Sequence, residues 1–447
     1  MMKDSIDFGK TKVTHLFRKL LLPTVLGMVF SALFVITDGI FVGRGLGSDA
    51  LAAVNIVAPL FLINTGIGLM FGLGASVVAS VHLSRGKVKT ARINVTQSVL
   101  VSSLFILLLS GLIVWKADDT ARLLGSSERL MPLAVDYIYG AVPFFVFSAL
   151  LSSGMFFVRL DASPKYAMMC NVVPALLNVA LDYLFIFEFR WGMLGAAVAT
   201  SLGFVAGAAM ILWYLFLRGR KIKLYPVKTH LKSLRMTVRN VGYMCRLGFP
   251  SLLCEAAIAT MMFVGNAAFI HYIGEDGVAA YSIACYFFPI IFMVYNAIAQ
   301  SAQPILSYNH GARFADRVRE ACRVALGTAV GCGVVFFLLT CFLSPLIVSL
   351  FLKPEYKAYE LAVDGLPLFA SGFVFFAVNI IAIGYYQSVE QDKAAMLVTV
   401  MRGFVWMLLC FWLMPVLFGL PGIWLAVPMA ELLTFIFVCW LYLTRKK

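Results

Sequence analysis

Long apolar runs alternate with short polar loops along the whole chain. Each run has about 20 or more residues, which is long enough to cross a hydrocarbon layer about 30 Å thick. The approximate limits of the runs are 14–41, 50–81, 93–115, 131–156, 165–187, 193–217, 243–272, 278–308, 322–351, 361–388, 394–417 and 422–443. This pattern predicts an all-α polytopic membrane protein with twelve transmembrane helices.

The second half of the chain repeats features of the first. Residues 47–56 read GSDALAAVNI and residues 274–283 read GEDGVAAYSI, an offset of 227. The same offset carries Pro23 onto Pro250. Several landmarks in one register indicate that the chain is an internal duplication.

The duplication predicts two pseudo-symmetric six-helix lobes, residues 1–217 and 243–447, joined by a basic cytoplasmic linker at 218–242. Six spans per lobe is an even number, so both lobes enter the membrane in the same orientation. Parallel repeats of this kind are related by an axis along the membrane normal, and they can rock about a site between them. This organisation favours a transporter that works by alternating access.

Composition and charge agree with a membrane location. The chain is 62% hydrophobic and 13% charged, whereas soluble domains are about 45–50% apolar and about 25% charged. The net charge is +14, but with the N-terminus inside, 29 of the 36 Lys and Arg residues fall in inner segments. This asymmetry follows the positive-inside rule. We therefore expect a multi-pass protein of the cell inner (plasma) membrane with both termini cytoplasmic, and no nucleic-acid partner.

Four acidic residues lie well inside the predicted spans: Asp38, Asp182, Glu255 and Glu431. A charged side chain at the bilayer centre costs several kcal/mol, so such residues mark ion or substrate pathways. For Asp38, an outer helix cap is the alternative interpretation. The acids are the first candidates for a functional site.

Asn178 precedes Asp182 by four residues, which places both side chains on one helix face. Amide and carboxylate oxygens suit sodium or a shared proton. Hydrogen bonds between helices also explain amides in membranes. They explain an aspartate poorly, so we expect this stripe to bind a cation.

In the second half, Glu255 and Asn266 share a helix face, and Gln300 belongs to a polar stripe on 278–308. Arg402 is a candidate partner for Glu431. Glu255, Asn266, Gln300 and Glu431 are therefore candidates for substrate binding or coupling.

Buried carboxylates also suggest a mechanism. A group that binds and releases a cation shifts a conformational equilibrium by its differential affinity for the two states. Inward flow of protons or sodium through such groups can drive an organic cation outward.

Several motifs resemble those of one family. TDGIFVGRGLGSDALAAVNI, NVALDYLFIF and WGMLGAAVATSLG resemble the N-terminal half of MATE (multidrug and toxic compound extrusion) transporters. QSAQPILSYNHGA and GLPGIWLAVPMAE resemble the bacterial MepA-type subgroup. The resemblance implies the MATE fold and secondary active efflux of organic, mostly cationic compounds in exchange for H+ or Na+. It also implies a role in xenobiotic transport and antibiotic resistance.

The resemblance further implies a cation site in the first lobe. The positions that match the family's site are Asp38, Asn178, Asp182 and Thr200, which would also be the ligands if the ion is Na+. Thr200 is identified by the resemblance alone.

Two alternatives remain. A flippase for lipid-linked saccharides, from the wider superfamily, needs cationic side chains to hold pyrophosphate. Here the predicted membrane interior is acidic, and Arg402 is the one basic candidate. An enzyme is not expected, because no hydrolase, metalloprotease or nucleotide-binding signature occurs. We expect no catalytic residues and no cofactor besides the coupling ion. The expected partners are small organic cations and membrane lipids, with the protein a monomer.

Overall fold

The computed structural model describes residues 7–227 and 230–445. Within these residues the secondary structure is helical, without strands. The α-helices are α1 (Val13–Leu46), α2 (Ser48–Ser84), α3 (Val88–Trp115), α4 (Ala117–Leu123), α5 (Met131–Ala141), α6 (Phe145–Leu160), α7 (Pro164–Asp182), α8 (Gly192–Trp213), α9 (Leu231–Tyr272), α10 (Glu275–Gly311), α11 (Ala315–Ser349), α12 (Lys357–Ala370), α13 (Phe373–Ser388), α14 (Asp392–Val400) and α15 (Trp406–Arg445). Short 3-10 or π-helical segments are η1 (Val142–Phe144), η2 (Tyr183–Glu188), η3 (Tyr214–Arg218) and η4 (Met401–Val405).

Ten helical segments of the described residues are long and apolar enough to cross a membrane, and α12 with α13 forms an eleventh that is bent by 46°. One of the ten, Asp392–Thr444, has 53 residues. At about 1.5 Å per residue it is far longer than one crossing needs. Gly419 interrupts it with a φ of 62°, a conformation that glycine adopts without strain. Divided there, the segment supplies two crossings, and the twelve predicted spans are accounted for.

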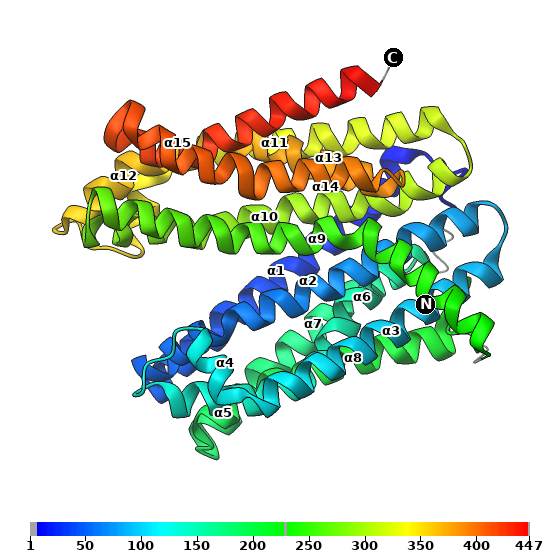
Figure 1. Ribbon diagram of the computed structural model, residues 1–447, viewed down its shortest axis with the longest axis horizontal. Helices are drawn as coiled ribbons and strands as arrows, with labels where there is room; N and C mark the ends of the chain where they lie inside the picture. Colours follow the sequence, from blue (N-terminus) through cyan, green and yellow to red (C-terminus); the bar gives the residue numbers. More distant parts are fainter. Residues whose placement is uncertain (1–6, 228–229, 446–447) are drawn as a thin grey trace. The chain divides into compact units, whose positions relative to one another are not determined.

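The chain forms two compact units (Figure 1). The first contains Met1–Leu252 and Ser307–Phe314, and the second contains Leu253–Leu306 and Ala315–Lys447. Helices α9 and α10 therefore each contribute residues to both units.

In the first unit α1 packs along α7, α7 along α8, and α2 along α3 and α6. Two glycines four residues apart on α8 allow α7 to approach closely. A Cβ atom at Gly203 would lie 3.3 Å from the Pro174 carbonyl oxygen, and one at Gly207 would lie 3.0 Å from Pro174 Cγ. Small residues at this spacing are typical of helix contacts in membranes. This contact sets the distance between the two helices that carry Asp182 and Thr200.

The second unit has a core of buried aromatic rings. Phe288 and Phe376 stack with centroids 4.6 Å apart, and Tyr295 meets Phe376 edge-on at 5.2 Å. Such pairs add to the energy of apolar burial and fix side-chain geometry. The core joins α10 to α13, the helix that also carries Asn379.

Candidate cation-coupling site

Three predicted residues of the first unit form one hydrogen-bonded chain. The Nδ2 atom of Asn178 donates to Thr200 Oγ1 at 3.4 Å, and Thr200 Oγ1 lies 3.2 Å from Asp38 Oδ1. The Thr200 hydroxyl is also 3.2 Å from the Ala196 carbonyl oxygen. A hydroxyl has one proton to donate, so these two acceptors compete for it. The contacts bring α1, α7 and α8 together at one point.

Asp182 completes the group. Its carboxylate is fully buried and lies against the carboxylate of Asp38, which is 9% exposed. Within the described residues, neither carboxylate oxygen of Asp182 nor Oδ1 of Asn178 accepts a hydrogen bond. Two ionised carboxylates are acceptors only, so they can bond to each other only when one carries a proton.

The local charge is uncompensated. No Lys, Arg or His of the described chain pairs with Asp38 or Asp182. Burying a charge without a partner is costly, and so is placing two like charges in contact. A proton shared between the carboxylates, or a small cation held by their oxygens and those of Asn178 and Thr200, cancels one of the two charges and so reduces this cost.

The backbone changes its helical form at this site. The π-helical segment η2 begins at Tyr183, directly after Asp182. Such segments interrupt α-helices rarely and are frequent at functional sites. Here η2 ends α7 immediately beyond the carboxylate.

Tyr137 of α5 is a member of the site that the sequence did not indicate. It is 3% exposed, contacts Thr200 and lies close to both carboxylates. Ser201 of α8 bonds to the Gly140 carbonyl oxygen at 2.9 Å, which holds α5 against α8. Tyr137 is an uncharged residue next to Asp136 near the outer end of its predicted span, so no local signal marks it as part of this site.

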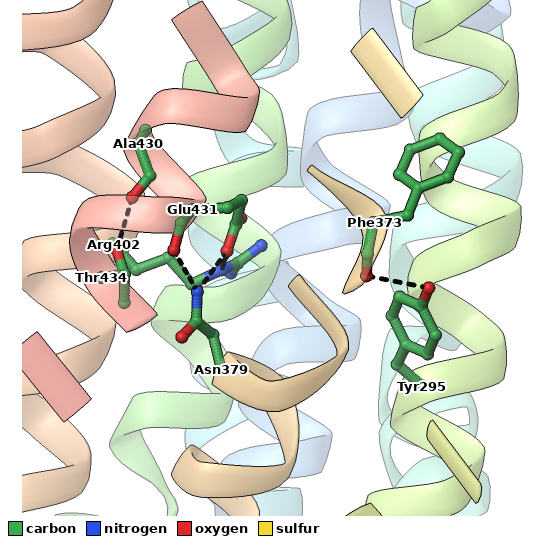
Figure 2. Close-up of polar contacts among 7 residues, drawn as sticks. All are labelled: Tyr295, Phe373, Asn379, Arg402, Ala430, Glu431 and Thr434. Carbon is green, nitrogen blue, oxygen red and sulfur yellow. Dashed lines mark hydrogen bonds and ion pairs between the residues drawn. The ribbon is translucent and has the colours of Figure 1, made fainter. Parts of the chain in front are cut away.

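In the second unit, Glu431 lies with Arg402 and Asn379 (Figure 2). The Nε atom of Arg402 is 2.9 Å from Glu431 Oε1 and 3.1 Å from Oε2. Asn379 Nδ2 donates to Oε2 at 2.7 Å and to the Glu431 carbonyl oxygen at 2.9 Å. The Arg402 guanidinium also stacks over the Phe376 ring, 4.5 Å from its centroid. This cluster joins α13, η4 and α15, and its net charge is zero.

The other predicted residues of this unit are in different surroundings. Glu255 on α9 is half-buried, Asn266 on α9 is exposed, and Gln300 on α10 is buried. The partners of Glu431 are Arg402 and Asn379 rather than any of these three. The structure thus brings the four first-unit candidates into one group. In the second unit, Glu431 contacts Arg402 and Asn379, and the candidates Glu255, Asn266 and Gln300 are not among its partners.

Many apolar helices that enclose ionisable groups are typical of integral membrane transporters. The MatE family model matches residues 23–184 and again 250–412. The two matches begin 227 residues apart, the offset of the sequence repeat. The chain therefore belongs to the MATE family, whose members are transporters rather than enzymes.

Individual proteins agree with this assignment. The multidrug export protein MepA of Staphylococcus aureus (strain N315) is 22% identical over 323 residues, which cover 70% of this chain and 68% of MepA. An FAD transporter of Shewanella oneidensis is 23% identical over 358 residues, 78% of this chain and 77% of that protein. A solved outward-facing structure of a multidrug resistance MATE transporter superposes with a TM-score of 0.86 at 20% identity. The superposition covers 98% of this chain and 97% of that chain, and it confirms the predicted fold.

Proposed function

We propose that this protein is a secondary active exporter that moves organic, mostly cationic compounds out of the cell in exchange for H+ or Na+. The coupling site is the first-unit group of Asp38, Asn178, Asp182 and Thr200. The observation that carries the proposal is the pair of touching, buried carboxylates without a basic partner. Such a pair needs a cation for charge balance, so its occupancy follows the ion gradient.

Coupling requires that the cation prefer one state of the protein. A ligand shifts a conformational equilibrium only by its differential affinity for the two states. Here α1, α7 and α8 each contribute one or two of the polar groups, so a rearrangement of these helices changes the ligand set. We infer that cation binding favours one arrangement of the two predicted lobes, 1–217 and 243–447, and that export follows their alternating access.

The substrate class rests on relatives and on charge. MepA is named a multidrug export protein, and it aligns over most of both chains. Organic cations are attracted by unpaired acids, and Glu255 is a half-buried acid within α9. Glu255 therefore remains our candidate for a substrate contact, with Asn266 and Gln300 as weaker ones. We place the protein in the plasma membrane with both termini cytoplasmic, as the distribution of Lys and Arg predicts.

The flippase alternative finds less support. It needs an unpaired intramembrane cation to hold pyrophosphate, whereas Arg402 is ion-paired with Glu431 and stacked on Phe376. Its charge is therefore already neutralised.

The test uses everted vesicles that contain the chain; their cytoplasmic face is outward, so efflux activity is measured as uptake of a fluorescent organic cation into the lumen. An imposed pH gradient and an imposed sodium gradient are compared at equal membrane potential. We expect efflux to follow one gradient and to stop when that gradient is collapsed by an ionophore. Indifference to both gradients would contradict cation coupling and favour the flippase.

A further inference from the structure

Helix α9 begins well before its apolar part. The segment Ser233–Tyr272 has 40 residues and is about 60 Å long at about 1.5 Å per residue. A hydrocarbon layer about 30 Å thick needs about 20 residues of it. Residues 247–272 are apolar enough to fill that layer. The preceding residues 233–243, which we name the α9 arm, therefore extend beyond it.

One face of the α9 arm is fixed to the first unit. Gln97 of α3 donates from Nε2 to Thr237 Oγ1 at 2.8 Å, and Asn240 Nδ2 donates to Gln97 Oε1 at 3.4 Å. Val241 and Met244 are buried on the same side. These contacts set the rotation of the arm about its axis, so the face it turns outward is defined.

That outward face combines two residue pairs. Leu234 and Val238, four residues apart, are 57% and 68% exposed. Arg235 and Arg239, also four apart, are exposed beside them. Residues at this spacing lie one above the other on a helix. The face therefore presents an apolar stripe directly next to a basic stripe.

The segment of sequence that contains the arm carries charge of one sign. No Asp or Glu occurs between Glu188 and Glu255. Within the described residues, neither Arg235 nor Arg239 forms an ion pair. A face that is apolar along one side and cationic along the other suits the membrane surface, where anionic headgroups adjoin acyl chains.

We propose that the α9 arm is a binding site for an anionic phospholipid. Arg235 and Arg239 hold the phosphodiester on the headgroup side of the layer, and Leu234 and Val238 pack against the glycerol backbone and the first acyl carbons of the same lipid. The lipid thereby anchors the end of the helix that carries Glu255 further along. This site is independent of the cation-coupling proposal, because none of its residues belongs to that site.

The test titrates phosphatidylglycerol into the purified full-length chain in detergent and counts bound lipid by native mass spectrometry, with phosphatidylcholine as the zwitterionic reference. We expect the wild type to prefer phosphatidylglycerol. A basic residue at a membrane surface contributes about 1 kcal/mol, so each Arg→Gln change should weaken binding roughly fivefold. The Arg235→Gln/Arg239→Gln variant should therefore bind roughly 25-fold more weakly. The matched control is Arg122→Gln, an exposed arginine whose loss should leave lipid binding unchanged.

A second variant separates a lipid from a free anion. Leu234→Ser/Val238→Ser keeps both arginines, and it should also weaken phosphatidylglycerol binding severalfold because apolar contact is lost. Unchanged binding in this variant, or displacement of the lipid by millimolar inorganic phosphate, would show a simple phosphate site and overturn the proposal. Equal affinity in the arginine variant and the wild type would overturn it as well. Unfolding midpoints in lipid-free detergent verify that all variants fold.

Discussion

Arg402 and Glu431 form an ion pair in which the side chains are only 2% and 1% exposed. Asn379 adds a hydrogen bond to the same carboxylate at 2.7 Å. The positive charge of the guanidinium cancels the charge that would otherwise make Glu431 a cation site. We therefore expect Glu431 to hold α13, η4 and α15 together, and we propose the coupling role for the first-unit site.

The pair predicts a strong coupling between two substitutions. Glu431→Leu or Arg402→Met alone leaves one buried charge without a partner, which should cost about 3–5 kcal/mol of unfolding free energy. The double variant Arg402→Met/Glu431→Leu removes both charges and should be close to the wild type, since apolar replacement of a buried pair is often neutral. Denaturant unfolding of the purified protein in detergent measures all three.

An exposed ion pair of similar length provides the control. Arg129 Nη2 lies 3.0 Å from Asp49 Oδ1, but these side chains are 77% and 45% exposed. Arg129→Gln should change the unfolding free energy by about 1 kcal/mol or less. If the buried and exposed pairs responded alike, burial would not be the source of the effect.

Asp38→Asn and Asp182→Asn should each abolish efflux driven by the ion gradient. Either change keeps the shape of the side chain but removes one of the two carboxylates, so the like-charge repulsion that a bound cation relieves is lost and the site binds a cation more weakly. We expect at least a tenfold loss of initial rate in vesicles, with facilitated exchange of substrate retained in Asp182→Asn. Asp119→Asn, an exposed aspartate of α4, is the control. Full gradient-driven efflux in either site variant would sink the coupling assignment.

Sequence patterns predicted the fold because each span is a local property. Most apolar runs match the observed helices to within a few residues, but α9 begins at Leu231 and α11 at Ala315, well before the predicted starts at 243 and 322. In addition, α14, η4 and α15 form one continuous segment through the break at Gly419. The lobe boundaries 217 and 243 stay a prediction, because compactness of the units does not test the limits of a duplication.

The site was predictable only in part. Asn178 and Asp182 are four residues apart, so their shared face follows from helix geometry. Tyr137 and Asn379 are brought in by packing between helices distant in the sequence, and neither carries a charge that marks it as unusual inside a membrane. The functional roles of the predicted residues stay predictions until they are measured.

Asp161, between α6 and α7, binds the segment that follows α8. Its carboxylate accepts hydrogen bonds from the backbone N–H groups of Arg220, Lys221 and Ile222 at 2.6, 2.7 and 2.9 Å. The Tyr214 hydroxyl adds a fourth at 2.8 Å. The beginning of the linker is therefore fixed to the first unit.

Asp161→Asn should release this segment. Hydrogen bonds to a charged group contribute about 1.5–3 kcal/mol each. Losing the free energy of even one such bond should raise the population in which residues 220–222 are detached at least tenfold. Limited trypsin digestion in detergent, with the cuts after Arg220 and Lys221 quantified by mass spectrometry, measures the opening. Asp316→Asn, at a 98% exposed side chain, is the control and should leave the rate unchanged. Equal cleavage in Asp161→Asn and the wild type would show that the Asp161 carboxylate does not hold this segment.

Two glycines of α9 separate helix propensity from helix packing. Gly248 faces the Met70 carbonyl oxygen of α2 so closely that no Cβ atom fits, whereas a Cβ atom at Gly242 would meet nothing within 4 Å. Gly242→Ala should stabilise the protein by about 0.5–1 kcal/mol through helix propensity alone. Gly248→Ala gains the same propensity but forces α2 and α9 apart, so it should be net destabilising by about 1–3 kcal/mol. Both are measured as unfolding free energies in detergent. Both variants add one methyl group to the same helix, so they differ only in what that group meets. If both changes stabilised the protein, the close approach of α2 to Gly248 would not occur in the folded state.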